Sequence, residues 1–453
     1  YTDAERATDF AAERADLTRL RREAEDTGDP NLRSRLLGEI GLLEATLATR
    51  RSWRFPSEQA AWQHAVLVDL VAGIEELAHP ETGILSRTRR RLERAAELRV
   101  RSIGDHQALW DRTIEDIADR ARSPRYGGLV IAPQLGLVPL GRDPDSGLHE
   151  FAHLNSGSVP TRDPATGRLV LESKSAVVLV LLPSTTYWMG AQSGADGGSN
   201  FDPEARDDEG PVHEVTLAPY FLSKYECTQG QWWEMTGGAL PSTYKPRNRL
   251  ARAPITWRNP LELVTWEECE RWMRRYNLVL PTEAQWEAAC RAGTTTRWCG
   301  ADEPIQLRAN VADRFLHDQG GPPEWAYNPE IDDGHLVHAP AGTYPANPLG
   351  LHDLHGNVWE WCADHYAEAY SPLPQVDPRG PDAGSSRVKR GGAWDSPAFL
   401  ARSAYRDHLE QNVRSPSTGC RPARPPSTAF TPKRMSRPWA ASAVSVQRIA
   451  SVP

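Results

Sequence analysis

The sequence predicts an α+β chain with two differently built halves, a helical N-terminal part and a loop-rich C-terminal part. In the first 122 residues, apolar side chains recur at the three- and four-residue spacing of a helix face. One such stripe consists of Leu32, Leu36, Ile40, Leu43 and Leu47. Beyond residue 175 this periodicity is weak, turns are dense, and twelve of the 16 tryptophans lie between Trp188 and Trp394. We therefore expect a helical bundle or stalk, followed by a domain held together by aromatic packing and polar networks.

Residues 1–122 are expected to form the helical bundle or stalk. One helix opens at Asp29-Pro30, and a second opens after Pro56 with Ser57 as its N-cap. The apolar stripe of the second helix consists of Trp62, Val66, Leu70, Ile74 and Leu77. Two further helices are expected over 84–102 and 105–121. Alternating Arg and Glu on the polar faces indicate a solvated surface, so no catalytic site is predicted in this part.

The rest of the chain divides into three segments. Residues 123–174 contain short apolar runs broken by Pro and Gly turns, which indicates a small β-rich module or an extension of the next domain's sheet. Residues 175–424 form the main domain, with helices expected over 265–276 and 282–292; Thr282 and Gln285 form a capping box for the second. Residues 425–453 are rich in Ser, Pro and Ala, and we expect this tail to be disordered.

Composition excludes several classes of function. The 453 residues include 52 Lys and Arg against 60 Asp and Glu, a net charge of −8, so no general nucleic-acid partner is expected. The longest apolar run, Ala176–Leu182, is far shorter than the ~20 residues that cross a bilayer. Six cysteines without a CxxC pair indicate neither a zinc site nor a disulfide framework. The chain starts at Tyr1 without an apolar signal core, so we expect a fragment or processed product of undetermined location.

Several ordered motifs identify the main domain. They are Trp188-Met189-Gly190, Pro211-Val212-His213, Tyr225-Glu226-Cys227-Thr228, Leu280-Pro281-Thr282-Glu283-Ala284-Gln285-Trp286-Glu287, Gly356-Asn357-Val358-Trp359-Glu360-Trp361, Arg390-Gly391-Gly392-Ala393-Trp394 and Arg402-Ser403-Ala404-Tyr405-Arg406. In this order they resemble the sulfatase-modifying-factor family, which includes the formylglycine-generating enzymes. The resemblance covers about residues 175–424 and implies a modified C-type-lectin-like α+β fold with little regular secondary structure.

A second resemblance concerns the segment before this domain. Tyr126-Gly127-Gly128-Leu129 and the run from Pro133 to Gly141 resemble the region that joins such domains to bacterial membrane serine/threonine kinases. This resemblance implies the extracytoplasmic, sensor side of a larger receptor. The residues given contain neither the His-Arg-Asp nor the Asp-Phe-Gly motif of a kinase domain.

The family resemblance also implies a test for catalysis. Formylglycine-generating members use O₂ to oxidise a cysteine in a Cys-x-Pro-x-Arg peptide, at a copper ion held by two cysteines. Counting from Gly391-Gly392, the matching positions are Ser396 and Ala401. Soft Cu(I) requires thiolates, which neither residue supplies. We therefore expect no copper and no cysteine-oxidising activity.

Two structural calcium sites are implied by the resemblance. The first comprises Asn310, Val311, Asp333 and His335, and the second comprises Asp353, Gly356, Val358 and Glu360. Each set mixes carboxylate or amide oxygens with backbone carbonyls, which suits the hard Ca²⁺ ion. The alternative is that Asp333 and Asp353 only fix turns and that Glu360 pairs with an arginine.

The residues around the lost copper site are expected to line a ligand-binding cleft for an unknown protein or small ligand. They are Trp394, Asp395, Ser396, Phe399, Arg402, Tyr405, Asp407, His408, Glu410 and Asn412. The alternative is that Trp394 and Tyr405 belong to the core and that the other residues form ordinary loops. The family's framework arginines match Arg390, Arg402, Arg406 and Arg421, which are expected to brace loops.

Three functions therefore compete. The first is a non-catalytic, calcium-stabilised binding or sensor domain. The second is an oxidoreductase acting on a protein cysteine, which Ser396 and Ala401 oppose. The third is a hypervariable ligand-display protein of a diversity-generating retroelement, because related domains serve as such display platforms.

Overall fold

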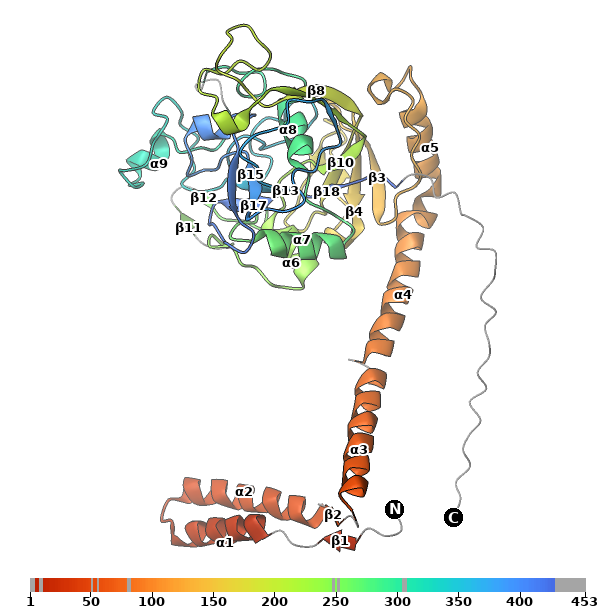
Figure 1. Ribbon diagram of the computed structural model, residues 1–453, viewed down its shortest axis with the longest axis vertical. Coiled ribbons are helices and arrows are strands. Elements are labelled where there is room, and N and C mark those ends of the chain that lie inside the picture. The colour runs from red at the N-terminus through yellow and green to blue at the C-terminus, as the bar shows by residue number, and fades with distance from the viewer. Residues whose placement is uncertain are drawn as a thin grey trace. The chain divides into compact units, whose positions relative to one another are not determined.

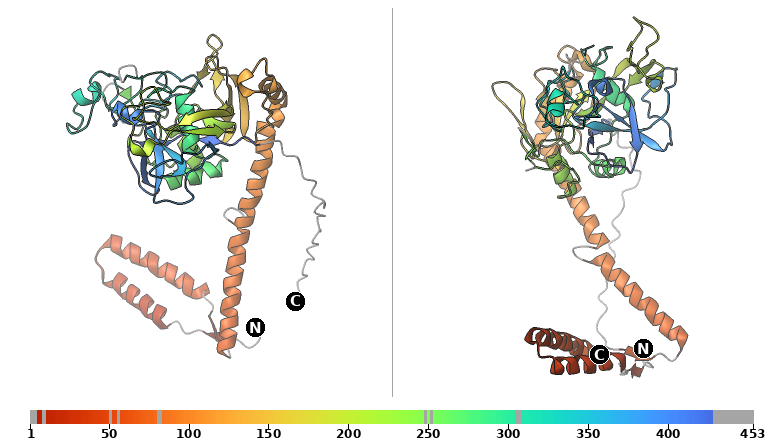
Figure 2. Two further views of the ribbon diagram at one scale, coloured as in Figure 1. Left: turned by 45° about the horizontal axis from the view of Figure 1, so that its top comes forward. Right: turned by 90° about the vertical axis from the view of Figure 1, so that its left-hand side faces the viewer.

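The computed structural model describes residues 5–7, 11–49, 52–54, 57–79, 83–246, 249–250, 253–303 and 308–427 (Figure 1, Figure 2). The chain forms two compact units, Tyr1–Ala96 and Glu97–Pro453. The tail from residue 428 onward, for which we predicted disorder, lies outside the described residues.

The first unit is helical. Its elements are β1 (Glu5–Ala7), α1 (Ala11–Asp26), α2 (Pro30–Thr49), β2 (Ser52–Arg54), α3 (Glu58–Ala78) and most of α4 (Ile84–Ser102). α1 and α2 pack through a small core that includes Ala24, Leu36 and Ile40, and β1 pairs antiparallel with β2. The predicted N-cap of α3 is confirmed, because the Ser57 hydroxyl accepts a hydrogen bond from the Ala60 N–H at 3.2 Å. No residue of α3 is buried.

The second unit is built around two larger sheets and several small ones. The five-stranded sheet has the order β18 (Ala423–Arg424), β10 (Tyr220–Ser223), β7 (Val178–Leu182), β4 (His149–His153) and β3 (Leu137–Arg142). The four-stranded sheet has the order β16 (Asp407–Glu410), β15 (Ser386–Arg390), β13 (Trp359–His365) and β17 (Thr418–Cys420). A three-stranded sheet joins β14 (Gln375–Val376), β9 (His213–Leu217) and β8 (Thr185–Met189). Short pairs join β5 (Thr161–Arg162) to β6 (Leu169–Val170) and β11 (Arg249–Leu250) to β12 (Ala253–Pro254).

The five-stranded sheet explains the apolar run that ends at Leu182. All five residues of β7 are buried, because β4 and β10 pair with its two edges and other elements cover both faces. Since β3 and β4 belong to this sheet, part of segment 123–174 is an extension of the main domain's sheet.

Helices of the second unit are short, and most of them begin with a side-chain N-cap. They are α5 (Gln107–Ala118), α6 (Gln229–Thr236), α7 (Trp266–Arg275), α8 (Glu283–Arg291) and α9 (Arg314–Asp318). The predicted capping box of Thr282 and Gln285 is present at the start of α8. Figure 1 shows α8 in the middle of the domain, where it contacts β8, β9, β13 and β15 and thus bridges two sheets.

The division into units falls before the end of the segment that we predicted to be the helical stalk. α5 belongs to the second unit, because Trp110 is fully buried and stacks on Phe151 of β4 at 5.5 Å between ring centroids. The Trp110 indole also donates a hydrogen bond to the Ser102 carbonyl at 2.8 Å. The α+β class, helical first and loop-rich afterwards, is confirmed.

Candidate functional site

The two positions that correspond to copper ligands lie inside the domain. After β15 the chain turns through Gly391 and Gly392, both with positive φ. A Cβ on Gly392 would lie 2.9 Å from the Ala401 Cα, so this close approach of two backbones requires glycine. Ala401 is fully buried, and the buried Ser396 hydroxyl accepts a hydrogen bond from the Trp359 indole at 3.2 Å. A methyl group and a hydroxyl therefore occupy these positions.

Aromatic side chains cover this region from several segments. Trp394 is 6% exposed and packs edge-to-face on Tyr244, with ring centroids 5.6 Å apart. The Trp394 ring also packs against the ring of Trp325, with the ring centroids 6.1 Å apart. Tyr405 is 8% exposed, and its hydroxyl accepts a hydrogen bond from Arg206 at 2.7 Å. Trp394 and Tyr405 thus belong to the buried aromatic cluster, as the alternative interpretation held.

The remaining predicted cleft residues separate into interior and surface groups. Arg402 is 1% exposed and lies inside the domain, where its guanidinium pairs with Asp202 and Glu209. It is therefore occupied within the fold and does not line an open cleft. Asp395 and Asp407 are half-buried, and Asp407 pairs with Lys389 at 2.8 Å. The exposed members are Phe399, His408, Glu410 and Asn412.

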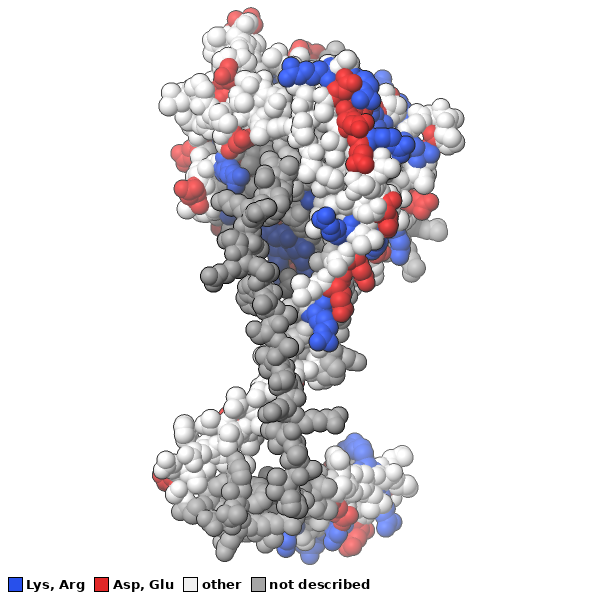
Figure 3. Space-filling view, turned by 90° about the vertical axis from the view of Figure 1, so that its right-hand side faces the viewer, with Lys and Arg blue, Asp and Glu red and all other residues white. Residues whose placement is uncertain are grey.

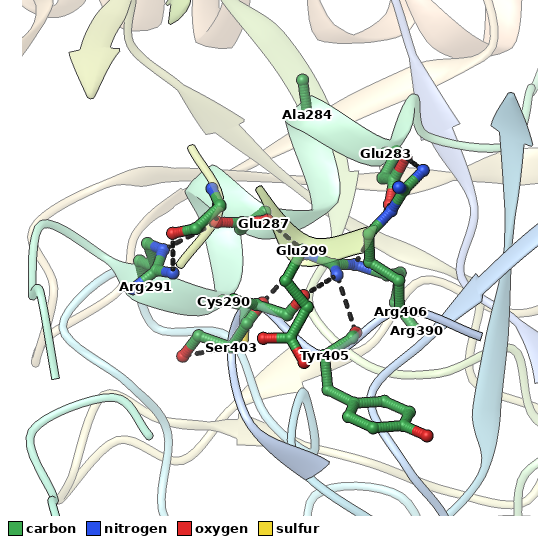
Figure 4. Close-up of polar contacts among 12 residues, drawn as sticks. Glu209, Glu283, Ala284, Glu287, Cys290, Arg291, Arg390, Ser403, Tyr405 and Arg406 are labelled. Atoms are coloured by element: carbon green, nitrogen blue, oxygen red, sulfur yellow. Dashed lines mark hydrogen bonds and ion pairs between the residues drawn. The ribbon is translucent and has the colours of Figure 1, made fainter. Parts of the chain in front are cut away.

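Buried ion pairs hold the loops around α8 (Figure 4). Arg390 pairs with Glu287 of α8 and donates hydrogen bonds to the carbonyls of Ser403, Ala404 and Tyr405 at 2.6–2.9 Å. Arg291 also pairs with Glu287, at 2.8 Å. Burial by itself raises the pKa of Glu287, but the two guanidinium groups outweigh it, so the pKa is lowered.

Two further arginines complete this framework. Arg406 binds Glu283 through both oxygens, at 2.6 and 2.9 Å. Arg421 binds Glu360 through both oxygens, at 2.6–3.0 Å. The expectation that Arg390, Arg402, Arg406 and Arg421 brace loops is therefore confirmed: all four are buried, and each pairs with at least one carboxylate.

The second predicted calcium set lies beside Arg421. Glu360 pairs with Arg421 and accepts a hydrogen bond from the Trp286 indole at 2.7 Å. Glu360 thus pairs with an arginine in this structure, as the alternative interpretation held. Asp353 accepts the Gly342 N–H at 2.5 Å, but its second carboxylate oxygen is buried without a partner. Burial raises the pKa of Asp353 to about 6. This unpartnered oxygen fits a site for a cation.

Sequence inspection missed a third carboxylate at this place. Glu226 is fully buried and accepts hydrogen bonds from the Asn357 side chain at 2.6 Å and the Val358 N–H at 3.1 Å. Burial raises the pKa of Glu226, and the negative charges of Asp353 and Glu360 add to the effect. Glu226 stands within a family motif, yet nothing in its sequence neighbourhood indicates these partners. Three buried carboxylates therefore lie near Arg421, but only Glu360 pairs with its guanidinium.

The first predicted calcium set is brought together in part. Asp333 accepts hydrogen bonds from the N–H groups of Val311 at 3.1 Å and His335 at 2.8 Å. It borders a surface hollow of about 400 Å³. Burial, together with the neighbouring Asp313, raises the pKa of Asp333 to about 8. Asn310 instead donates its side-chain amide to the Val337 carbonyl at 2.9 Å.

The geometry of both sets limits what could bind there. In the part of the chain that the structure describes, no three His, Cys, Asp or Glu side chains converge as metal ligands. A cation at either place would therefore need backbone carbonyls or water as additional ligands, which Ca²⁺ accepts readily.

Figure 3 shows Lys and Arg interspersed with Asp and Glu on one face of the molecule.

These features define a loop-rich α+β domain braced by buried arginines, with no thiol at the two expected copper positions. The Sulfatase-modifying factor enzyme 1-like domain matches residues 172–426, more than half of the chain, so the chain belongs to this family. The formylglycine-generating enzyme of Streptomyces coelicolor is 34% identical over 214 residues, 46% of this chain and 62% of that enzyme. The chain thus spans less than two thirds of that relative.

Other relatives have different names. The serine/threonine-protein kinase pkn1 of Chlamydia caviae is 28% identical over 293 residues, 59% of this chain and 42% of the kinase. The solved structure of Treponema denticola variable protein 1 covers 55% of this chain and 96% of its own, with 22% identity and a TM-score of 0.43. None of the helices described here combines the length and apolar character needed to cross a bilayer.

Proposed function

We propose that the domain is a non-catalytic binding or sensor member of the sulfatase-modifying-factor family. The observation that carries this proposal is the pair Ser396 and Ala401 at the positions of the copper-binding cysteines. A protonated hydroxyl and a methyl group cannot replace two thiolates around Cu(I). Ser396 is also engaged with the Trp359 indole.

Two other cysteines, Cys290 and Cys299, are not poised as substitute ligands. Cys290 is fully buried, and its sulfur lies 3.6 Å from the His355 ring and 3.8 Å from the Ser403 hydroxyl. Cys299 is half-buried and directs its sulfur to the Arg291 carbonyl at 3.5 Å. Burial raises the pKa of both thiols, which opposes the thiolate form that binds copper.

We expect no turnover when the protein is incubated with copper, O₂ and a Cys-x-Pro-x-Arg peptide, because the two positions that match the copper ligands, Ser396 and Ala401, carry no thiol. The measurement is mass analysis of the peptide for loss of the thiol and formation of the aldehyde. The matched control is the Ser396→Cys, Ala401→Cys double variant, which should gain Cu(I) binding in competition with a chromophoric chelator. Aldehyde formation by the unmodified chain would overturn the proposal.

The exposed residues of the same stretch are the proposed recognition surface. Phe399, His408, Glu410 and Asn412 offer an aromatic ring, an imidazole, a carboxylate and an amide to solvent. His408 is fixed in place, since it stacks on Tyr366 at 4.0 Å between ring centroids. The relationship to a bacterial kinase supports a sensor role within a larger receptor, as the second resemblance implied.

We also propose that calcium stabilises the domain. The support comes from the unpartnered Asp353 oxygen, the excess of buried carboxylates beside Arg421, and Asp333 beside Asp313. A ligand that binds only the folded state at about a hundredfold excess over Kd stabilises it by about 2.7 kcal/mol. Excess EDTA should therefore lower the melting temperature, and added calcium should restore it.

The loss of melting temperature in EDTA should depend on pH. With a folded-state pKa of about 8, above its ordinary value of 3.8, Asp333 supports the metal-free fold when protonated and loses that contribution as pH rises towards 8. Calcium must displace this proton. The melting-temperature loss on adding EDTA should thus grow between pH 5 and pH 8. Asp333→Asn should remove the growth, whereas Asp145→Asn, at an exposed position outside this site, should leave it. An unmoved transition in EDTA at pH 8 contradicts the calcium proposal.

A further inference from the structure

A pocket of about 260 Å³ lies beside the start of α8 in the C-terminal domain. It is lined by Met189 at the end of β8, His213 at the start of β9, Glu283 and Ala284 of α8, and parts of the stretch 364–381. None of the residues predicted for the cleft or for calcium lines it. The pocket is therefore a separate candidate for a binding site.

Two hydrogen-bond acceptors of this pocket lack a partner. The Nδ1 atom of His213 lies 3.0 Å from the Pro211 carbonyl oxygen. Because a carbonyl can only accept, Nδ1 carries the proton, and the neutral ring presents a lone pair at Nε2, to which no residue of the described part bonds. Asp364 is 4% exposed, and its Oδ2 accepts the Glu283 N–H at 2.8 Å. Its Oδ1 accepts no hydrogen bond from another described residue.

The charges around the pocket are only partly paired. Glu283 binds Arg406 through both oxygens and accepts the Tyr370 hydroxyl at 3.0 Å, so these two charges cancel (Figure 4). Within the described residues, neither Asp364 nor the exposed Arg379 forms an ion pair. Burial, together with the neighbouring Glu283, raises the pKa of Asp364 to about 7. The pocket thus offers one carboxylate and one guanidinium to a ligand.

We propose that this pocket binds a free α-amino acid with a small aliphatic side chain. The ammonium group donates to Asp364 Oδ1 and His213 Nε2, and the carboxylate pairs with Arg379. Met189 and Ala284 supply apolar surface for the side chain. A metal ion fits less well, because no third His, Cys, Asp or Glu of the described residues converges with these two acceptors. The site does not depend on the loss of copper or on the proposed recognition surface.

The test first screens the full chain, with calcium present, by thermal shift against glycine, L-alanine, L-valine, L-leucine and L-methionine. Isothermal titration calorimetry then compares L-valine with isobutylamine, which lacks the carboxylate, and with isovalerate, which lacks the ammonium group. We expect L-valine to bind about tenfold more tightly than either analogue, because each analogue leaves a charged group of the pocket unpaired.

Two variants assign the two ends of the ligand. Arg379→Ala should weaken L-valine binding about tenfold and leave isobutylamine binding unchanged, since only the amino acid offers a carboxylate. Asp364→Asn should weaken the binding of both, although its amide oxygen can still accept the Glu283 N–H. Because Arg379 is exposed, Arg379→Ala should keep the circular dichroism spectrum of the unmodified chain. The matched control is Arg168→Ala, which removes an exposed arginine outside the pocket and should not change binding.

Three outcomes would overturn the proposal. The first is that none of the five amino acids binds. The second is that L-valine binds no better than isovalerate, or binds the Arg379→Ala variant as tightly as the unmodified chain. The third is binding that appears only with added Zn²⁺, which would assign the pocket to a metal ion. None of these outcomes bears on copper chemistry, which the peptide assay tests separately.

Discussion

Replacing Glu287 by alanine should destabilise the C-terminal domain by about 3–5 kcal/mol. Glu287 is fully buried on α8, where Arg390 and Arg291 both pair with it and the Gly190 N–H donates to it at 2.8 Å. Its removal leaves two guanidinium groups buried without their carboxylate. An unpaired buried charge is far more destabilising than a missing contact at the surface.

The measurement is urea unfolding followed by tryptophan fluorescence and far-ultraviolet circular dichroism. A suitable control is Asp145→Ala, which removes the exposed pair between Asp145 and Arg168, whose side chains are 58% and 67% exposed. Exposed pairs contribute about 0–1 kcal/mol. Equal effects of the two substitutions would show that the buried network does not hold the loops.

Local chemistry made much of the architecture predictable. Thr282 and Gln285 are three residues apart, so their mutual hydrogen bonds with the backbone can be inferred from the sequence. The same signature, Thr228 with Gln231, starts α6, an eight-residue helix that we did not predict. The buried strand ending at Leu182 follows from its continuous apolar run.

Long-range pairing was not predictable in the same way. Arg402 meets Glu209 from 193 positions away, and Asn357 meets Glu226 from 131 positions away. Nothing near either residue in the chain indicates its partner. The resemblance therefore identified the framework arginines, and the alternative interpretation named Glu360 as an arginine's partner. The carboxylates that pair with Arg390, Arg402 and Arg406 came from the structure.

For a related reason, the sequence left open whether the aromatic residues at the candidate site are buried or exposed. An aromatic residue in a loop suits both a binding surface and a core, and the local sequence does not separate them. The structure places Trp394 against Tyr244 and Trp325, which come from loops 150 and 69 residues earlier in the chain. Phe399, only five residues later, is 41% exposed.

This contrast gives the second prediction. Trp394→Ala should destabilise the domain by about 3–5 kcal/mol, because it leaves a cavity among buried aromatic side chains. Phe399→Ala, on the exposed side of the same stretch, should change the free energy of unfolding by no more than about 0.5 kcal/mol. Both values come from urea unfolding of the full chain.

A third variant separates packing from hydrogen bonding. The Trp394 indole N–H is buried without a partner, so Trp394→Phe keeps a ring against Tyr244 and Trp325 and removes an unpaired polar group. It should therefore be markedly less destabilising than Trp394→Ala. If the free energy of unfolding of Trp394→Ala instead lies within about 1 kcal/mol of that of the unmodified chain, this residue does not support the core. Its ring and its free N–H would then belong to the recognition surface with Phe399.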